Sequence, residues 1–287
     1  MPTVARMRTP LLCLCGLMWN SSAGAQPVLE GARTVLTAVV NGQGRAIVDV
    51  SLDDFVVTEG GQPREVLDVH VADYPMAVIV DDRPEASGGI PALRSAARRF
   101  VQRVGERPVA LFTFTKGIEP LTTLEDDRAA VLERLGTIEA GTSGDASAID
   151  TVARAAALLK SSGASFSAVV IIAAAPVDAT QLVRGELLPQ IVDSGAAVHV
   201  VQGQPPDASV PSDPTAPDLL RLIADQTHGQ FTAIFSTVSY TAALDRLADR
   251  LAIEMMVQYM VPPGPKAGDV QVGVRLPGAR VVGLGVR

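Results

Sequence analysis

Four short runs of almost wholly apolar residues, separated by helical patterns, constrain this chain more than any other feature. The runs, rich in Val, Ile and Ala, lie at 76–80, 108–114, 167–173 and 196–202. Such strands are typical of a parallel sheet, where both faces are buried. Apolar residues three and four positions apart fill the intervals and predict amphipathic helices. In the first interval these are Ile90, Leu93, Ala97, Phe100, Val101 and Val104.

Because strand and helix alternate, we expect an α/β fold: a Rossmann-like, mostly parallel sheet with helices on both faces. The flanks differ from this middle part. Short β segments are predicted at 33–40, 45–50 and on both sides of the turn 59–62, and again at 253–261, 269–276 and 279–286. Neither flank has enough strands to bury a sheet alone, so we expect the two to pair in a small antiparallel β module.

The predicted organisation therefore has four parts. Residues 1–25 resemble a secretory signal peptide, with Arg6 and Arg8 before a short apolar core and small residues before a cut after Ala25. Residues 26–74 form the N-terminal β segment, 75–253 the α/β domain, and 254–287 the C-terminal strands that pack with the N-terminal segment.

The composition excludes several classes of function. The two cysteines, Cys13 and Cys15, lie in the predicted signal, so the mature chain has no disulfide and no thiolate site. Without Arg6 and Arg8, 22 basic residues face 31 acidic ones, a net charge of −9 with no basic cluster for nucleic acid. No segment of the mature chain is apolar for long enough to span a membrane. We therefore expect an exported protein, periplasmic or extracellular.

The stretch "VIVDDRPEASGG", residues 78–89, carries the chemistry that most needs explanation. Asp81 and Asp82 follow an apolar strand directly, at the carboxyl end where open α/β sheets gather ligands. The three histidines, His70, His199 and His228, lie far apart in the sequence and have no metal-ligand spacing.

At this point the chain resembles a known family, the von Willebrand factor A-like domain of secreted bacterial proteins. The leading β segment at 48–69, the helix and glycine turn at 218–234, and the closing helix and tyrosine-bearing strand at 247–261 carry the resemblance. The resemblance implies a metal-ion-dependent adhesion site built from Asp-x-Ser-x-Ser, a Thr and a third-loop Asp. Those oxygen ligands suit Mg²⁺, which takes six hard donors in octahedral geometry.

On this sequence the adhesion site is degenerate. Asp81 matches the leading Asp, and Thr142 matches the Thr, but Arg83 and Glu85 stand at the two serine positions. In the third loop, residues 173–175 are alanines where the acid would stand, and Asp178 lies too far along. We expect no cofactor, with an alternative in which Mg²⁺ or Mn²⁺ binds at a new site made by Asp81, Glu85 and Thr142.

Two arrangements of Arg83 remain open. In the first, its guanidinium replaces the ion and pairs with Asp81 or Glu85, because an arginine cannot ligate a metal and would repel one. In the second, which we favour from the general behaviour of surface charges, Arg83 points to solvent.

We expect a secreted, non-enzymatic protein-binding module of the adhesion type that works without a metal. Its binding crevice would be formed by the loops at the carboxyl ends of the strands. The predicted crevice residues are Asp81, Asp82, Arg83, Glu85, Thr142 and Ser143. One alternative is a hydrolase using the carboxylates of Asp81, Asp82 and Glu85. Another is a structural subunit of an envelope assembly that contacts its partners through the β flank.

Overall fold

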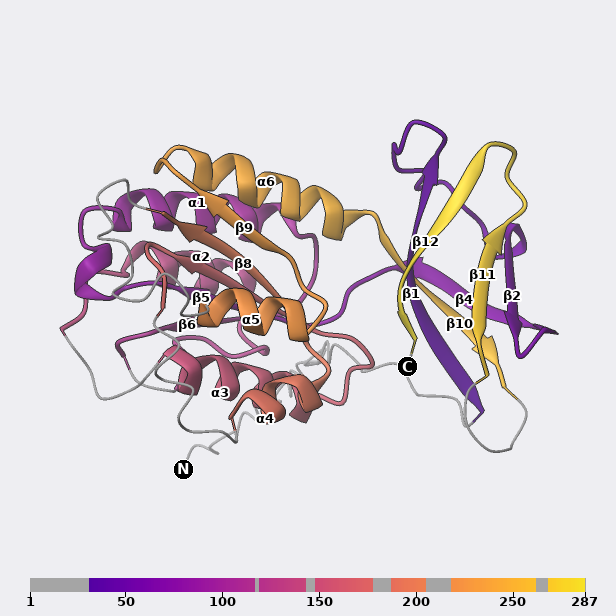
Figure 1. Cartoon of the computed structure of the whole chain (residues 1–287), viewed down its shortest axis with the longest axis horizontal. Helices are drawn as coiled ribbons and strands as arrows, with labels where there is room; N and C mark the ends of the chain where they lie inside the picture. The colour runs from indigo at the N-terminus through magenta and orange to yellow at the C-terminus, as the bar shows by residue number, and fades with distance from the viewer. Residues whose placement is uncertain are drawn as a thin grey trace, which may run out of the picture.

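Five parallel strands form the central sheet, in the order β6-β5-β7-β8-β9. This computed structural model describes residues 31–116, 119–142, 148–177, 187–204, 218–261 and 268–286. The strands are β5 (Met76–Val80), β6 (Val109–Thr113), β7 (Ala168–Ala173), β8 (Ala197–Gly203) and β9 (Phe231–Ile234). The expected parallel α/β sheet is confirmed, and each apolar run predicted as a strand forms one (Figure 1).

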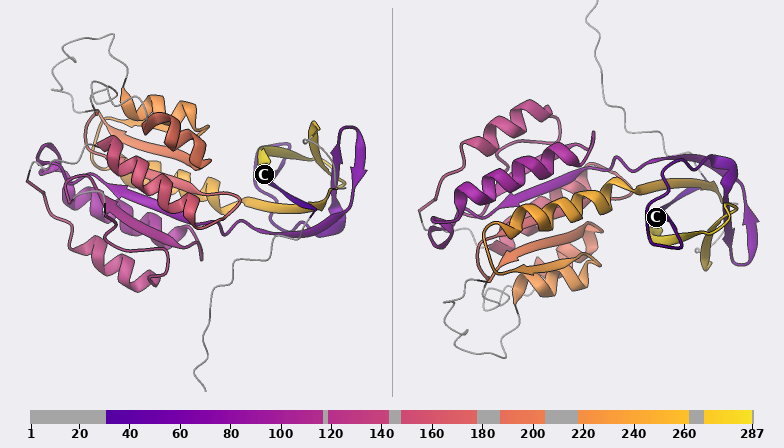
Figure 2. Two further views of the ribbon diagram at one scale, coloured as in Figure 1. Left: turned by 90° about the horizontal axis from the view of Figure 1, so that it is seen from below. Right: turned by 90° about the horizontal axis from the view of Figure 1, so that it is seen from above.

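Helices cover both faces of this sheet, which gives the domain its three layers (Figure 2). The helices on one face are α1 (Ile90–Arg103), α2 (Arg128–Gly136) and α6 (Ser239–Ala252). Those on the other face are α3 (Ala148–Ser161), α4 (Leu187–Ser194) and α5 (Leu219–Gln226). Alternate residues of β5 enter the two cores, with Val78 on the first face and Ile79 on the second. Two short 3₁₀ turns, η1 (Leu52–Asp54) and η2 (Pro84–Ala86), complete the helical elements.

The flanking strands form a separate antiparallel sandwich, here called the β module. Its larger sheet has the order β12-β1-β10-β4, with β12 (Ala279–Val286), β1 (Ala32–Asn41), β10 (Glu254–Met260) and β4 (Val66–Val71). Its smaller sheet has the order β11-β2-β3, with β11 (Val270–Val274), β2 (Phe55–Glu59) and β3 (Gln62–Arg64). N-terminal strands pair with C-terminal ones in both sheets, because neither flank alone could bury the shared core.

Two expectations for the N-terminal flank need correction. The predicted strand at 45–50 does not form, apart from one bridge between Ala46 and Val40. Instead the Asn41 side chain accepts the backbone N–H groups of Gln43 and Arg45, both at 2.9 Å, and these bonds curl the chain into a turn. The segment after the turn 59–62 divides into β3 and β4, which lie in different sheets.

Two further expectations concern the chain ends and membranes. The predicted signal peptide, residues 1–25, lies outside the described residues. Within the described part, no helix has both the length and the hydropathy needed to cross a membrane.

Three buried side chains tie together the two points where the chain passes between the β module and the α/β domain. Tyr74 lies in the first crossing and donates its hydroxyl to Glu254 Oε2 at 2.5 Å, in the second crossing. Arg107 stacks over the Tyr74 ring at 4.1 Å, donates to the Leu251 carbonyl at 2.7 Å and lies 3.6 Å from Glu254. Burial raises the pKa of Glu254 and of Tyr74, while the charge of Arg107 acts in the opposite direction on both.

The variant Tyr74→Phe tests this junction. It removes the hydroxyl that donates to the buried Glu254 carboxylate, so we expect the free energy of unfolding at pH 7 to fall by about 1–3 kcal/mol. The Glu254 pKa is already raised in the folded state and should rise further in the variant. The folded state then binds protons more readily than the unfolded state, so the loss should shrink as the pH falls and the carboxyl becomes neutral.

Urea unfolding at neutral and at acidic pH measures this effect. Tyr240→Phe is the matched control, because the Tyr240 hydroxyl donates to a neutral carbonyl, that of Ala173, at 2.7 Å. Its loss should stay the same at both pH values. An equal loss at both pH values for Tyr74→Phe would contradict the role given to Glu254.

Candidate functional site

The two adjacent acids after β5 are both buried. Asp81 and Asp82 each have 0% of their surface exposed, so neither faces solvent at the carboxyl edge of the sheet. The Asp81 backbone N–H donates to the Ile172 carbonyl at 2.9 Å and extends the pairing of β5 with β7 by one residue. This pair of strands is the switch point of the sheet, where the chain connections on either side run in opposite directions.

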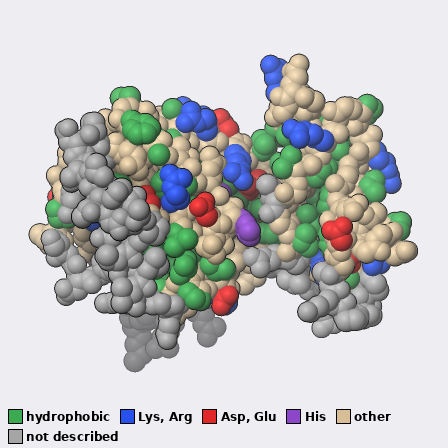
Figure 3. All heavy atoms as spheres, in the orientation of Figure 1, with side chains coloured by type: hydrophobic (Ala, Val, Ile, Leu, Met, Phe, Trp, Pro, Cys, Tyr) green, Lys and Arg blue, Asp and Glu red, His purple; other side chains and the backbone are tan. Residues whose placement is uncertain are grey.

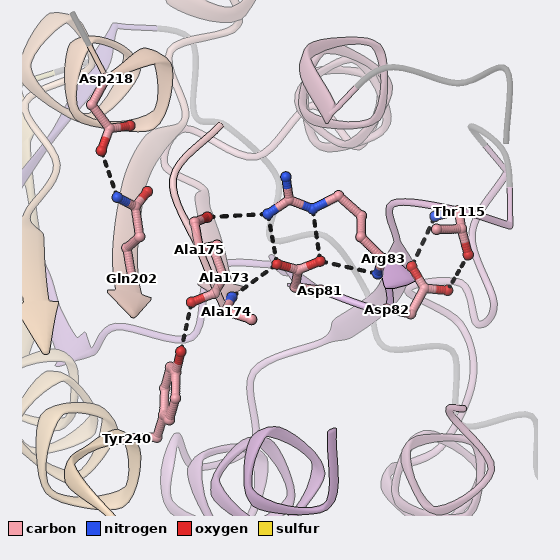
Figure 4. Close-up of polar contacts among 10 residues, drawn as sticks. All are labelled: Asp81, Asp82, Arg83, Thr115, Ala173, Ala174, Ala175, Gln202, Asp218 and Tyr240. Carbon is pink, nitrogen blue, oxygen red and sulfur yellow. Dashed lines mark hydrogen bonds and ion pairs between the residues drawn. The ribbon is translucent and has the colours of Figure 1, made fainter. Parts of the chain in front are cut away.

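Asp81 forms a bidentate ion pair with Arg83 (Figure 4). Arg83 donates from Nε to Asp81 Oδ1 at 2.9 Å and from Nη2 to Oδ2 at 2.7 Å. Two backbone N–H groups complete the set, that of Arg83 to Oδ1 at 3.1 Å and that of Ala174 to Oδ2 at 2.8 Å. A carboxylate has about four acceptor positions, and all four are used here. These bonds compensate the cost of burying the charge.

The Arg83 guanidinium also bridges to the loop that follows β7. Its Nη2 donates to the Ala175 carbonyl at 3.0 Å, and the group lies over the Phe114 ring at 5.4 Å from its centre. Only 22% of the side chain is exposed. The favoured expectation that Arg83 points to solvent is therefore wrong, and the structure has the alternative arrangement, the pair with Asp81. A buried carboxylate two residues away outweighs hydration of the guanidinium because it offers two parallel charged bonds.

Asp82 joins two further segments, one of them the loop that follows β6, the neighbour of β5 on the side away from β7. Its Oδ1 accepts the Thr115 backbone N–H at 2.8 Å, and its Oδ2 accepts the Thr115 hydroxyl at 2.7 Å. Its own carbonyl accepts the Gly141 N–H at 2.7 Å. A Cβ on Gly141 would lie 1.7 Å from Thr115 Oγ1, so only glycine permits this close approach. The two acids thus fix the loops after β5, β6 and β7 and the segment before α3.

Among the other residues predicted for the site, the structure describes the side chain of Thr142 but not those of Glu85, Ser143 and Asp178. Thr142, next to Gly141, is exposed. Ser143 and Asp178 lie outside the described residues, and the Glu85 side chain is not described either. Of the six predicted crevice residues, the structure therefore brings Asp81 and Arg83 into contact and places Asp82 beside them, with Thr142 one residue from the Gly141 contact.

Tyr240 contacts the end of β7 at this edge. Its hydroxyl donates to the Ala173 carbonyl at 2.7 Å, at the end of β7 (Figure 4). Burial raises the Tyr240 pKa, and the nearby negative charge of Asp81 raises it further. Gly203 is the glycine that this packing requires, since a Cβ there would meet the Tyr240 hydroxyl at 2.6 Å. Tyr240 therefore stays a neutral donor.

Some of these contacts were not predicted residue by residue. Thr115 and Phe114 follow β6 as Asp81 follows β5. Their position directly after a predicted strand is the sequence signal that could have identified them as site residues. The contributions of Ala174 and Ala175 come from backbone atoms, and side-chain identity gives no signal for those.

This arrangement does not fit a divalent cation. Both Asp81 oxygens already accept bonds from Arg83, which carries a permanent positive charge at a position where the resemblance implies a serine ligand. Across the described ranges, no group of three or more His, Cys, Asp or Glu side chains could hold a metal ion. Among the described residues, the carboxylate oxygens that Mg²⁺ or Mn²⁺ would need here already accept hydrogen bonds from protein groups.

Comparison with known proteins gives the fold class. No family model matches the sequence, and no curated protein matches it either. Among solved structures, the chain is similar to a von Willebrand factor type A protein from Catenulispora acidiphila, with a TM-score of 0.53 and 12% identity over 90% of this chain and 73% of that one. Two weaker likenesses follow. BatB from Bacteroides thetaiotaomicron has a TM-score of 0.46 and 15% identity over 62% and 98% of the two chains. The mussel byssus protein PTMP1, with a zinc-occupied adhesion site, has a TM-score of 0.49 and 11% identity over 70% of this chain and 50% of that one.

By its fold, the chain contains a von Willebrand factor type A-like domain, which confirms the resemblance seen in the sequence. The antiparallel β module extends that domain at the end opposite the carboxyl edge (Figure 1).

The variant Arg83→Ala should show that the ion pair holds this edge together. It removes two charged bonds from a fully buried carboxylate, and because the arginine is partly exposed we expect a loss of about 2 kcal/mol in the free energy of unfolding. Arg99→Ala is the matched control. It breaks a pair with Asp245 in which more than half of the arginine is exposed, and should cost about 0–1 kcal/mol.

Chemical denaturation measures the stability of Arg83→Ala and of the control Arg99→Ala. The same measurement on Asp81→Ala and on the double variant Asp81→Ala/Arg83→Ala gives the coupling free energy between Asp81 and Arg83. A coupling near zero would show that the pair contributes nothing to this edge.

Proposed function

We propose that this protein is an exported, non-enzymatic protein-binding module of the adhesion type. It recognises its partner at the carboxyl edge of the parallel sheet without a divalent cation. The single observation that supports this best is the Asp81 carboxylate, whose acceptor positions are filled by Arg83 and the Ala174 N–H.

The Arg83 guanidinium links the loop after β5 to the loop after β7, as a bound metal ion would. It contacts Asp81 in the loop after β5 and the Ala175 carbonyl in the loop after β7. A metal also offers an open coordination position to an incoming carboxylate, whereas arginine has donors only. Recognition at this edge would therefore depend on shape and hydrogen bonding from the loop tips. Exposed residues available there include Lys116 and Thr142.

The hydrolase alternative has less support. General acid–base catalysis needs a carboxyl group within hydrogen-bond reach of a substrate. Asp81 and Asp82 have no exposed surface, and their oxygens are occupied by Arg83, Ala174 and Thr115. The envelope-subunit alternative involves the β module and does not compete for the same surface.

Titration calorimetry with Mg²⁺ and with Mn²⁺ tests metal independence. We expect no binding heat at millimolar ion concentrations, because Arg83 repels a cation and fills the Asp81 oxygens. The mussel byssus protein named above, titrated with Zn²⁺, is the positive control. Micromolar binding of either ion to this protein would overturn the proposal.

Partner contact is tested by a photo-crosslinking amino acid placed at Thr142, which is exposed beside the predicted edge. The matched control places it at Glu125, which is exposed before α2. We expect protein adducts at position 142 in the producing cells, in equal yield with and without a chelator. Adducts that disappear with the chelator, or equal adducts at both positions, would contradict recognition at this edge without a metal.

A further inference from the structure

The turn that follows β1 holds the one asparagine of the sequence outside the predicted signal. Asn41 is the last residue of β1, and Gly42 comes directly after it; the other asparagine of the sequence is Asn20. Asn41 is half-buried, whereas residues 42–46 are exposed. The turn projects from the top of the β module in the view of Figure 1, and it stands clear of neighbouring atoms in the space-filling view (Figure 3). Water therefore has access to the peptide bond between Asn41 and Gly42.

Two backbone donors hold the Asn41 side chain. Its Oδ1 accepts the N–H groups of Gln43 and Arg45, both at 2.9 Å. The bond from Gln43 closes an Asx turn, which folds the side-chain carbonyl back over the backbone that follows Asn41. The carbonyl carbon Cγ is thereby kept on the side of the Gly42 nitrogen. Two donors on one carbonyl oxygen also stabilise negative charge that develops on that oxygen.

Two nitrogens beside this carbonyl carry no hydrogen bond within the described ranges of the chain. The Gly42 N–H has no acceptor there, although the N–H groups of Gly44 and Arg45 in the same turn both donate. The Asn41 Nδ2 has no acceptor there either. A Cβ built on Gly42 would meet no atom within 4 Å, so the space around this backbone nitrogen is open.

We propose that Asn41 is a site of spontaneous deamidation, with water as the co-reactant. The Gly42 nitrogen loses its proton to the solvent and attacks Asn41 Cγ, which closes a succinimide ring. The bond from Cγ to Nδ2 breaks, and the nitrogen takes a proton from the solvent and leaves as ammonia. Water then opens the ring. Addition at Cγ breaks the new bond and leaves aspartate, whereas addition at the main-chain carbonyl breaks the original peptide bond and leaves isoaspartate.

The turn assists the step that closes the ring. As the Gly42 nitrogen adds to Cγ, negative charge develops on Oδ1, which already accepts two N–H groups. Closure also depends on glycine, because a side chain at position 42 would restrict the backbone rotation that brings the two atoms together. The ordered backbone of the folded turn opposes the same rotation. Since these effects offset each other, we expect the folded and the unfolded chain to react at rates within about threefold of each other.

The two products differ in their effect on the β module. An aspartate at position 41 keeps a side-chain oxygen for the two N–H groups of the turn, so the turn is retained and gains a negative charge. An isoaspartate lengthens the main chain where the pairing of Asn41 with Ala279 of β12 ends, and it removes the acceptor of the turn. We therefore expect isoaspartate to break the hydrogen bond from the Ile47 N–H to the Val39 carbonyl, at 2.8 Å.

The modification is thus an irreversible change that accumulates with the age of the protein and loosens one end of β1. It concerns the β module, so the inference does not rest on the function proposed for the carboxyl edge.

Peptide mapping of the intact protein measures the reaction. The protein is incubated at mildly alkaline pH, once folded and once in urea. Trypsin then cleaves after Arg33 and Arg45 and releases residues 34–45, which contain Asn41 as their single asparagine. Chromatography with mass spectrometry separates the unmodified, aspartate and isoaspartate peptides, and a sample digested without incubation corrects for deamidation during digestion. We expect both products from the folded protein, at a total rate within about threefold of the rate in urea.

Gly42→Ala is the matched variant. Gly42 is not among the glycines with positive φ, and the added Cβ has open space, so the fold should be kept. We expect deamidation of this variant to be slower by roughly tenfold or more. Hydrogen exchange checks the products: the Ile47 amide should lose protection in the isoaspartate fraction, and should keep it in Asn41→Asp, which has the chemistry of the other product.

Three results would overturn the proposal. The first is a rate in the folded protein more than threefold below the rate in urea, which would show that the turn protects Asn41; this comparison requires no variant. The second is an equal rate for Gly42→Ala and the unchanged sequence. The third is an Ile47 amide that stays protected in the isoaspartate fraction.

Discussion

No side chain of the central strands β5 and β7 is exposed on either face of the sheet, and the position of the site follows from that burial. Parallel strands covered by helices on both sides can offer polar groups only at their ends. Asp81 and Asp82 begin where the apolar run of β5 stops, at the switch point beside β7. Buried there, the two carboxylates need partners, and the loops of neighbouring strands supply them.

The hydrogen-bond partners of the two carboxylates explain how protein groups hold the loops at this edge of the von Willebrand factor type A-like fold. Arg83 fills both oxygens of Asp81 and reaches the loop after β7, while Asp82 fixes Thr115 and, through its carbonyl, Gly141. An arginine pair of this kind is present as soon as the chain folds.

Different interactions stabilise the carboxyl edge of the sheet and the β module. At the carboxyl edge every carboxylate oxygen of the two buried acids has a donor, and the close approach at Gly141 leaves no space for a larger residue. The β module instead joins strands from both chain ends, and apolar side chains of β4, β11 and β12 are only partly buried against its core. The buried Tyr74–Glu254 bond with Arg107 connects these two parts.

The sequence by itself determined the parallel sheet, its covering helices and the pairing of the flanks, because period and apolar content report burial directly. It also placed Asp81, Asp82 and Arg83 at one strand end. It could not decide where the guanidinium points, since that depends on the Ala175 carbonyl and the Phe114 ring, which only folding brings near Arg83. Its prediction of a strand at 45–50 was wrong, because that segment forms one bridge, Ala46 to Val40, and no strand ladder. Contacts made through backbone atoms exist only in the tertiary structure because side-chain identity does not encode them.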